Sequence, residues 1–249
     1  MNTEKFTGIA EDYTVGRPSY ADSFIDYLFT ELGFTSETII ADIGCGTGKL
    51  TKQILDRGSF VYGVEPNEDM RSVAVKELIK YEKFTSVKGD ASNTSLQDRS
   101  VDFVTAAQAF HWFNIYEFRS ECKRIIKDNG KVILIWNSRD ESDEVNKAIY
   151  TMNKKFCPNF KGFSGGIKKD DERIIEFFSG EYERLRFDNP LYYNKDTFIS
   201  RCLSSSYSLK QGDKNYDEYI SYAKCIFDKY SIDGILKIGN NTVAYIGNA

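Results

Sequence analysis

The sequence of 249 residues contains a single histidine, and its five cysteines are scattered. One histidine, His111, excludes every metal site that is built from several histidines. The cysteines are odd in number and form no Cys-x-x-Cys pair, which argues against a zinc site or a disulfide framework. We therefore expect no bound metal and reduced thiols that serve mainly in packing. The thiols are those of Cys45, Cys122, Cys157, Cys202 and Cys225.

Long apolar runs and clusters of basic residues are also missing. No stretch approaches the roughly 20 apolar residues of a membrane span, and the opening MNTEKFTGIAEDY lacks the apolar core of a signal peptide. The formal net charge is −4, and no Lys/Arg cluster suits a nucleic-acid backbone. With 41% apolar and 28% charged residues, the composition is that of an ordinary folded protein. We expect a cytoplasmic protein with no membrane or nucleic-acid partner, and of unknown oligomeric state.

Strand and helix patterns alternate along the first 138 residues. Apolar runs predict strands at TIIADIG, FVYGVEP, FTSVKGD, VDFVTAAQA and GKVILIWNS. Helical spacing predicts helices at about 19–32, 50–58, 67–80 and 116–127. Because parallel strands require long crossover connections, this alternation predicts an open, doubly wound α/β sheet.

The second half of the chain is less regular. It has helical patterns near 145–156, 170–178, 197–203 and 216–230, and strand patterns at YERLRFD and NTVAYIGN. We expect the two strands to complete the sheet and the helices to cover it. The prediction is one domain over 1–249, with a core at about 34–138 and a cover from 1–33 and about 139–235.

Three glycines at alternate positions follow the first predicted strand, in ADIGCGTGKL. Alternating glycines where a strand turns into a helix allow a ligand to lie against the backbone, although a tight turn alone would also explain them. The dinucleotide pattern G-x-G-x-x-G would need a glycine at position 49 or 51, where Lys49 and Thr51 stand, and no P-loop motif occurs. This spacing disfavours a pyrophosphate ligand.

Acidic residues stand at the ends of the next two predicted strands. Glu65 ends the second strand, where a carboxylate can accept hydrogen bonds from both hydroxyls of a ribose. Asp90 ends the third strand, where an exposed turn aspartate is the alternative explanation. Ligands of such sheets bind beyond the carboxyl ends of the strands, so both residues are candidate ligand contacts.

This ordered set resembles the class I S-adenosylmethionine-dependent methyltransferases. ADIGCGTGKL, VYGVEPNEDM, VKGDASNTSLQDRSVDFV and GKVILIW are similar to their successive motifs, over roughly Thr38 to Trp136. YTVGRPSY, QAFHWF, SSSYSLK and VAYIG also resemble a small-molecule subgroup that includes trans-aconitate methyltransferase-like proteins. The resemblance implies a Rossmann-like, doubly wound, mostly parallel seven-stranded sheet, with the last strand antiparallel and a helical cover.

The same resemblance implies S-adenosyl-L-methionine as the cofactor. Glu65 would hold the ribose, Asp90 and the Ala91 N–H would meet the adenine, Met70 would pack on its face, and Asp42 would lie near the ammonium group. The full set of implied cofactor contacts is Arg17, Asp42, Gly44, Cys45, Gly46, Thr47, Glu65, Pro66, Met70, Asp90, Ala91 and Gln108.

Fewer residues bear on the methyl acceptor. His111 lies beyond the fourth predicted strand and is the candidate general base, with an orienting role as the alternative. Arg17 and Arg139 are candidates for binding an anionic group, with solvated arginines as the alternative. Candidate acceptor contacts are Tyr13, Tyr20, Trp112 and Arg139.

The fourth predicted strand ends in AAQAFHWF rather than in the Asn/Asp-Pro-Pro-Tyr tetrapeptide often carried by amino-directed nucleic-acid methyltransferases of this fold. Together with the acidic net charge, this favours a small-molecule acceptor, with oxygen of a carboxylate or hydroxyl first and carbon or nitrogen behind it. Two rivals stay open. They are a cofactor-binding module without catalysis and, less favoured by the glycine spacing, a nicotinamide-dependent oxidoreductase.

Overall fold

The computed structural model describes residues 18–163, 171–205 and 207–249. Its strands are β1 (Ile39–Ile43), β2 (Phe60–Val64), β3 (Phe84–Val87), β4 (Val101–Ala107), β5 (Ile126–Arg139), β6 (Tyr182–Asp188), β7 (Leu191–Tyr193), β8 (Leu236–Ile238) and β9 (Asn240–Gly247). Its helices are α2 (Asp22–Thr30), α3 (Lys49–Leu55), α4 (Glu68–Leu78), η2 (Phe110–Trp112), α5 (Ile115–Ile125), α6 (Glu144–Phe156), α7 (Glu172–Phe177), α8 (Lys195–Leu203) and α9 (Tyr216–Tyr230).

Seven strands form one sheet in the order β3-β2-β1-β4-β5-β9-β6. The pairs β1–β2, β1–β4, β2–β3 and β4–β5 are parallel, and one strand of the sheet is antiparallel. The strand order reverses at β1, so that the chain passes to β2 and β3 on one side of β1 and to β4 and β5 on the other. The predicted Rossmann-like class is confirmed. The two-stranded sheet β7–β8 was not predicted.

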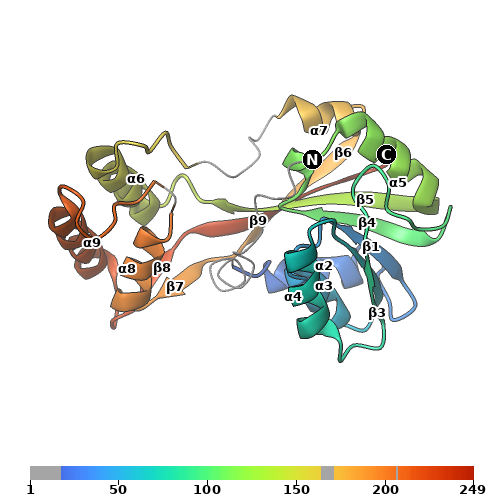
Figure 1. Cartoon of the computed structure of the whole chain (residues 1–249), viewed down its shortest axis with the longest axis horizontal. Coiled ribbons are helices and arrows are strands. Elements are labelled where there is room, and N and C mark those ends of the chain that lie inside the picture. Colours follow the sequence, from blue (N-terminus) through green and yellow to red (C-terminus); the bar gives the residue numbers. More distant parts are fainter. Residues whose placement is uncertain (1–17, 164–170, 206) are drawn as a thin grey trace. The chain divides into compact units, whose positions relative to one another are not determined.

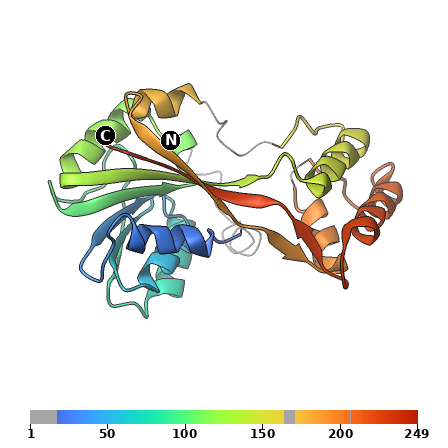
Figure 2. The same ribbon diagram turned by 180° about the vertical axis from the view of Figure 1, so that it is seen from behind.

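Side chains alternate between the two faces of this sheet, as the period of a strand requires. On β5, Val132, Leu134 and Trp136 pack with α5 and α7, whereas Ile133 and Ile135 pack with α2 and α3. Figure 1 shows α5 and α7 on one side of the sheet and α2, α3 and α4 on the other, and Figure 2 shows the same layers from behind. Helical cover on both faces explains why β1 (IIADI) and the Val132–Trp136 part of β5 are almost continuously apolar.

Several helices begin at a side-chain cap that the sequence supplies. The Asn67 side chain accepts from the Met70 N–H at the start of α4, and the Asn114 side chain accepts from two backbone N–H groups at the start of α5. Such a cap satisfies donors that the first helical turn leaves unpaired and is worth about 1 kcal/mol. The caps fix where each helix starts relative to the strand before it.

The chain forms two compact units. The first unit comprises 1–136, 167–187 and 242–249, and the second comprises 137–166 and 188–241. The second unit has its own apolar core, to which α6, α8, α9 and β8 contribute. Residues 34–136 of the predicted core lie in the first unit, and the predicted cover divides between the two units. No helix in the described part of the chain combines the length and the apolar character that crossing a bilayer requires.

Candidate functional site

The carboxyl ends of neighbouring strands in the first unit meet at one edge of the sheet. Ile43, the last residue of β1, pairs with Val64, the last residue of β2, and Val64 pairs with Val87, the last residue of β3. The residues that directly follow β1, β2 and β3 therefore lie side by side at this edge. The Gly44 N–H donates to the Val64 carbonyl at 2.8 Å, and the Glu65 N–H donates to the Val87 carbonyl at 3.1 Å.

The three glycines of the loop after β1 all have positive φ, but they serve different purposes. A Cβ on Gly44 would lie 2.8 Å from the Ala109 Cβ, so packing requires glycine there. At Gly48 the φ of +82° favours glycine, and a Cβ would also displace the end of the Leu78 side chain, 2.6 Å away. At Gly46, where φ is +59°, no atom of the described residues other than its two chain neighbours lies within 4 Å of such a Cβ. The tight-turn explanation accounts for Gly44 and Gly48, whereas Gly46 faces open space.

Glu65 is held beside Gly46 by the backbone. Its Oε2 accepts from the Gly46 N–H at 2.9 Å, and its Oε1 accepts from the Asn67 N–H at 2.9 Å. Burial raises the pKa of the Glu65 carboxyl, and these two hydrogen bonds oppose that shift. Because each carboxylate oxygen has two lone pairs, each can accept one further hydrogen bond. A carboxylate oriented in this way suits two adjacent hydroxyl groups.

Asp42 is occupied within the protein. The side chain is 1% exposed, and it accepts from the Thr51 hydroxyl at 2.6 Å and from the Thr105 hydroxyl at 2.9 Å. Burial raises the pKa of Asp42 to about 6, although these hydrogen bonds and one from the Thr51 backbone lower it. The carboxylate therefore joins β1 to the first turn of α3 and to β4. Its predicted proximity to an ammonium group stays a prediction.

Asp90 organises the turn that follows β3. Its Oδ1 accepts from the Ser92 N–H at 2.8 Å, the Ser92 hydroxyl at 2.6 Å and the Asn93 N–H at 3.0 Å. Partial burial opposes ionisation, but these hydrogen bonds outweigh it and lower the pKa of Asp90. These three hydrogen bonds all go to Oδ1. Next to Asp90, Ala91 is 3% exposed. A carboxylate and a largely buried alanine therefore follow the carboxyl end of β3.

Three predicted cofactor contacts flank these positions. Met70 lies in the first turn of α4 and is 3% exposed, and Pro66 lies between Glu65 and the cap of that helix. Gln108 directly follows β4 with φ +55°, and its N–H donates to the Ile135 carbonyl at 2.8 Å. A non-glycine residue with positive φ is uncommon and marks a strained backbone next to the site.

The residues after β4 form the short helix η2, in which Phe110 is buried against the core. His111 is half-buried and its ring lies 4.9 Å from that of Trp112, between centroids, while Trp112 is 39% exposed. Both side chains follow the same strand end as Gln108. His111, the candidate base, thus lies in η2 beyond the end of β4.

Cys45 and Thr47 contribute to the loop mainly through their backbone. The Cys45 N–H donates to the Val64 carbonyl at 3.2 Å, and the Thr47 residue is 6% exposed. Burial holds the pKa of the Cys45 thiol well above its usual range, and the neighbouring Asp42 and Glu65 carboxylates add to that effect. A thiol in this state is a packing group rather than a nucleophile.

The structure does not join every predicted residue to this site. Tyr13 and Arg17 lie outside the described residues. Tyr20 is 7% exposed and packs in the core beneath α2, and its backbone exchanges hydrogen bonds with the Gln53 side chain. Arg139 ends β5 in the second unit, with its guanidinium 4.1 Å from the centre of the Phe163 ring.

Some residues that support the site were not predicted. Thr51 and Thr105 hold Asp42, and Glu121 on α5 holds the loop after Asp90. Sequence pattern marks Glu121 as a polar residue of an amphipathic helix, which is usually exposed, and nothing in the pattern indicates its burial. Its spacing of three residues from Arg124 was the one available signal of an ion pair.

Comparison with known proteins finds a family similar to the strand-end region. Residues 41–134, which include the glycine loop, Glu65, Asp90 and His111, match a family described as "Methyltransferase domain". The match begins within β1 and ends within β5, so it covers the four strand ends described above.

Proteins similar to this chain occur in fungi and bacteria. An uncharacterised methyltransferase-like protein of Schizosaccharomyces pombe is 34% identical over 165 residues, which make up 64% of this chain and 63% of the relative. An uncharacterised methyltransferase of Mycobacterium tuberculosis is 36% identical over 129 residues, or 52% of this chain and 50% of the relative. The chain thus spans between half and two thirds of the length of these relatives.

Solved structures share the fold beyond residues 41–134. A protein of Anaeromyxobacter dehalogenans, provisionally assigned as a type II methyltransferase, superposes with a TM-score of 0.67 at 17% identity and covers 93% of this chain and 97% of its own. At this identity the likeness concerns the fold.

Proposed function

We propose that the protein transfers the methyl group of S-adenosylmethionine to a small-molecule acceptor, with oxygen as the preferred acceptor atom. The observation that carries this proposal is Glu65, whose two carboxylate oxygens are each held by a backbone N–H beside the open space at Gly46. A ribose needs two acceptors at this spacing, and the match to the methyltransferase family supplies the remaining context. Asp90 and Ala91 at the next strand end are the proposed adenine contacts.

Methyl transfer from a sulfonium is an in-line substitution at an activated carbon, so the protein mainly aligns the two reactants and excludes water. The proposed contacts of the methionine part are the Gly44–Thr47 backbone, and Met70 is proposed to pack on the adenine. An ionised carboxylate acceptor needs no base, whereas a hydroxyl acceptor requires one. His111 is the proposed base for a hydroxyl acceptor.

The small-molecule acceptor is supported by the acidic net charge and by AAQAFHWF after β4. For an acidic acceptor, Arg17 is the proposed anion-binding group, and Tyr13 and Trp112 are proposed to complete its surroundings. The likeness to trans-aconitate methyltransferase-like proteins supports a carboxylate in particular.

Calorimetric titration tests the cofactor site. We expect S-adenosylmethionine and S-adenosylhomocysteine to bind the wild-type protein, and Glu65→Ala to weaken binding by about 1.5–3 kcal/mol, the usual worth of hydrogen bonds to a charged group. Glu68→Ala is the matched control, because Glu68 is exposed on the same connection and its side chain contacts Arg71 rather than the loop. Absence of binding to both ligands would overturn the proposal, and unchanged affinity in Glu65→Ala would remove Glu65 from the ribose.

A binding module without catalysis is the second candidate, favoured by the fact that methyl transfer can proceed without a dedicated catalytic side chain. Radiolabelled S-adenosylmethionine offered with carboxylic acids, alcohols and amines separates the two. Methylation of one class establishes the enzyme and its acceptor atom. Cofactor binding with no turnover on any class would establish the module.

A further inference from the structure

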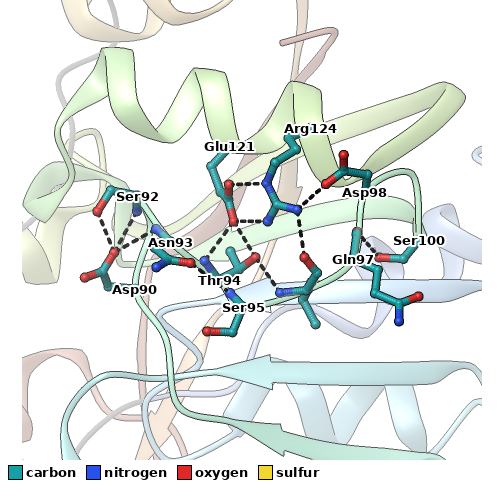
Figure 3. A network of polar contacts seen from close by, with 11 residues as sticks. Asp90, Ser92, Asn93, Thr94, Ser95, Gln97, Asp98, Ser100, Glu121 and Arg124 are labelled. Atoms are coloured by element: carbon teal, nitrogen blue, oxygen red, sulfur yellow. Dashed lines mark hydrogen bonds and ion pairs between the residues drawn. The ribbon is translucent and has the colours of Figure 1, made fainter.

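The segment between β3 and β4 contains no helix or strand, yet it carries the residues proposed to meet the adenine. Backbone groups in such a segment need partners outside regular structure. Figure 3 shows that many of these partners come from α5, through one carboxylate, Glu121, and one guanidinium, Arg124. Both residues lie in the first unit with the loop that they contact.

Glu121 is 7% exposed and receives hydrogen bonds from two directions. Its Oε1 accepts from the Thr94 N–H at 2.8 Å and from the Thr94 hydroxyl at 2.6 Å. Arg124 donates to both carboxylate oxygens, from Nε at 2.8 Å and from Nη2 at 2.6 Å. Partial burial of the carboxylate opposes its ionisation, but the donors from Arg124 and Thr94 outweigh it and lower the pKa of Glu121, so the group is a fixed anion.

Arg124 extends this anchor along the loop. Its Nη1 donates to the Leu96 carbonyl at 2.8 Å and to the Asp98 carboxylate at 2.6 Å. The pair Glu121–Arg124 therefore holds the loop at Thr94, Leu96 and Asp98. A bidentate arginine–carboxylate pair has fixed geometry, so the three points are held relative to one another as well as to the helix.

The anchor reaches the proposed adenine contacts through Thr94, which is fully buried. Thr94 follows Asn93, whose carbonyl accepts from the Asp90 N–H at 3.0 Å, while the Asn93 N–H donates back to the Asp90 carboxylate. A Cβ on Gly89 would lie 2.8 Å from the Thr94 carbonyl, which shows how closely the two ends of this turn approach. Fixing Thr94 therefore fixes the turn that carries Asp90 and Ala91.

We propose that Glu121 is the positioning residue for the adenine end of the cofactor. It touches no reacting atom; through Thr94 it sets the position of the Asp90 carboxylate and the Ala91 N–H. The inference rests on the proposed function, since it requires an adenine ligand at this turn. It predicts a loss of selectivity for the base, whereas a merely structural role would affect all ligands alike.

The test compares S-adenosylhomocysteine with S-inosylhomocysteine in the full chain. The inosine base has an oxygen in place of the adenine amino group and an N–H in place of the ring nitrogen acceptor, so it mismatches both Asp90 and Ala91. We expect the wild-type protein to prefer the adenine ligand by at least about tenfold, the effect of one lost hydrogen bond to a charged group. In Glu121→Ala this preference should fall towards equality.

Three variants serve as controls. Glu117→Ala removes an exposed carboxylate from the same helix and should keep the wild-type preference. Glu65→Gln should weaken both ligands and leave their ratio unchanged. Thr94→Val, which removes only the hydroxyl, should lose part of the preference and gives a milder variant if Glu121→Ala fails to fold, as judged by circular dichroism.

The outcomes separate this inference from the proposed function. If the wild-type protein binds neither ligand, the proposed function fails. If it binds both and does not discriminate, the proposed adenine contacts and the role of Glu121 are both overturned. If it discriminates and folded Glu121→Ala and Thr94→Val retain the full preference, the cofactor site stands and Glu121 is not its positioning residue.

Discussion

Two carboxylates at the carboxyl ends of adjacent strands, Asp42 and Glu65, differ in what surrounds them. Asp42 accepts from the hydroxyls of Thr51 and Thr105 and is 1% exposed, whereas Glu65 accepts from the backbone N–H groups of Gly46 and Asn67 and lies beside open space. The hydroxyls can rotate to solvate a buried carboxyl in either protonation state. The first residue is therefore part of the framework, and the second is available to a ligand.

The burial of Asp42 predicts a specific dependence of stability on pH. Its pKa is raised from an ordinary value of 3.8 to about 6 in the folded protein. The folded state therefore binds a proton more tightly than the unfolded state, so the stabilisation from Asp42 is present below pH 4 and is lost as the pH rises to about 6. The full loss is about 3 kcal/mol, at 1.36 kcal/mol for each pH unit.

Asp42→Asn should remove this contribution. We expect the difference in unfolding free energy between wild-type and Asp42→Asn proteins to change across pH 4 to 6, in favour of the variant as the pH rises. Other carboxyl groups titrate in both proteins and cancel in the difference. Urea unfolding at several pH values measures this difference. If the unfolding free energies of the two proteins run parallel against pH, Asp42 has an ordinary pKa.

At the scale of elements, the loop between β1 and α3 contains one glycine that packing requires and one that lies beside the space proposed for the ligand. Gly44 and Gly46 both have positive φ, which costs a residue with a Cβ about 1–2 kcal/mol. Only Gly44 would also place its Cβ against a fixed atom, the Ala109 Cβ at 2.8 Å, and such overpacking adds about 1–3 kcal/mol. Gly46 has room for the new methyl group, in the space proposed for the cofactor.

We therefore expect two alanine substitutions in this loop to differ in their effects on stability and on ligand binding. Gly44→Ala should lower the unfolding free energy by about 2–5 kcal/mol, and Gly46→Ala by about 1–2 kcal/mol, in urea unfolding. Gly46→Ala should nevertheless weaken S-adenosylhomocysteine binding by at least about tenfold, equivalent to 1.4 kcal/mol. Full affinity in Gly46→Ala would move the ligand away from this glycine.

The elements of the first unit could be predicted from sequence because each follows from a local pattern. β1, β2 and β4 are apolar runs buried on both faces, and the predicted fourth helix, about 116–127, differs from α5 by one or two residues at each end. β7 and β8 have three residues each, too few for a pattern of period two to stand out. Strand-end residues such as Glu65 were located for the same local reason.

What the sequence could not show depends on contacts between distant residues. Glu121 and Thr94 are 27 positions apart, and Asp42 and Thr105 are 63 apart. No periodicity encodes such a pairing, so Glu121 was indistinguishable from an exposed helical glutamate, and the threonine partners of Asp42 could not be identified. The local chemistry of the site was therefore predictable, and the residues that hold it in place were not.

For the whole molecule, each of the two units has its own core, and the proposed cofactor contacts that the structure describes lie in the first. In the second core Tyr219 is fully buried, and its hydroxyl lies 3.1 Å from both the Asn153 Oδ1 and the Cys202 carbonyl. Loss of that hydroxyl removes a hydrogen bond from these acceptors, of which the Cys202 carbonyl keeps the Ser208 hydroxyl as a donor, so the cost is about 0.5–1.5 kcal/mol. Tyr219→Phe thus weakens the fold without touching the site.

The rise in Tm on addition of a ligand then distinguishes a change in stability from a change in ligand binding. A ligand that binds only the folded state at 100 times its Kd adds about 2.7 kcal/mol, and for a chain of this size that raises Tm by roughly 5–10 °C. We expect this rise for the wild-type protein with S-adenosylhomocysteine, as measured by differential scanning calorimetry. Tyr219→Phe should begin from a lower Tm and show the same rise, whereas Glu65→Ala should show a much smaller rise at the same ligand concentration. An equal rise in Glu65→Ala would place the ligand elsewhere on the chain, because linkage depends only on the affinity of the folded state.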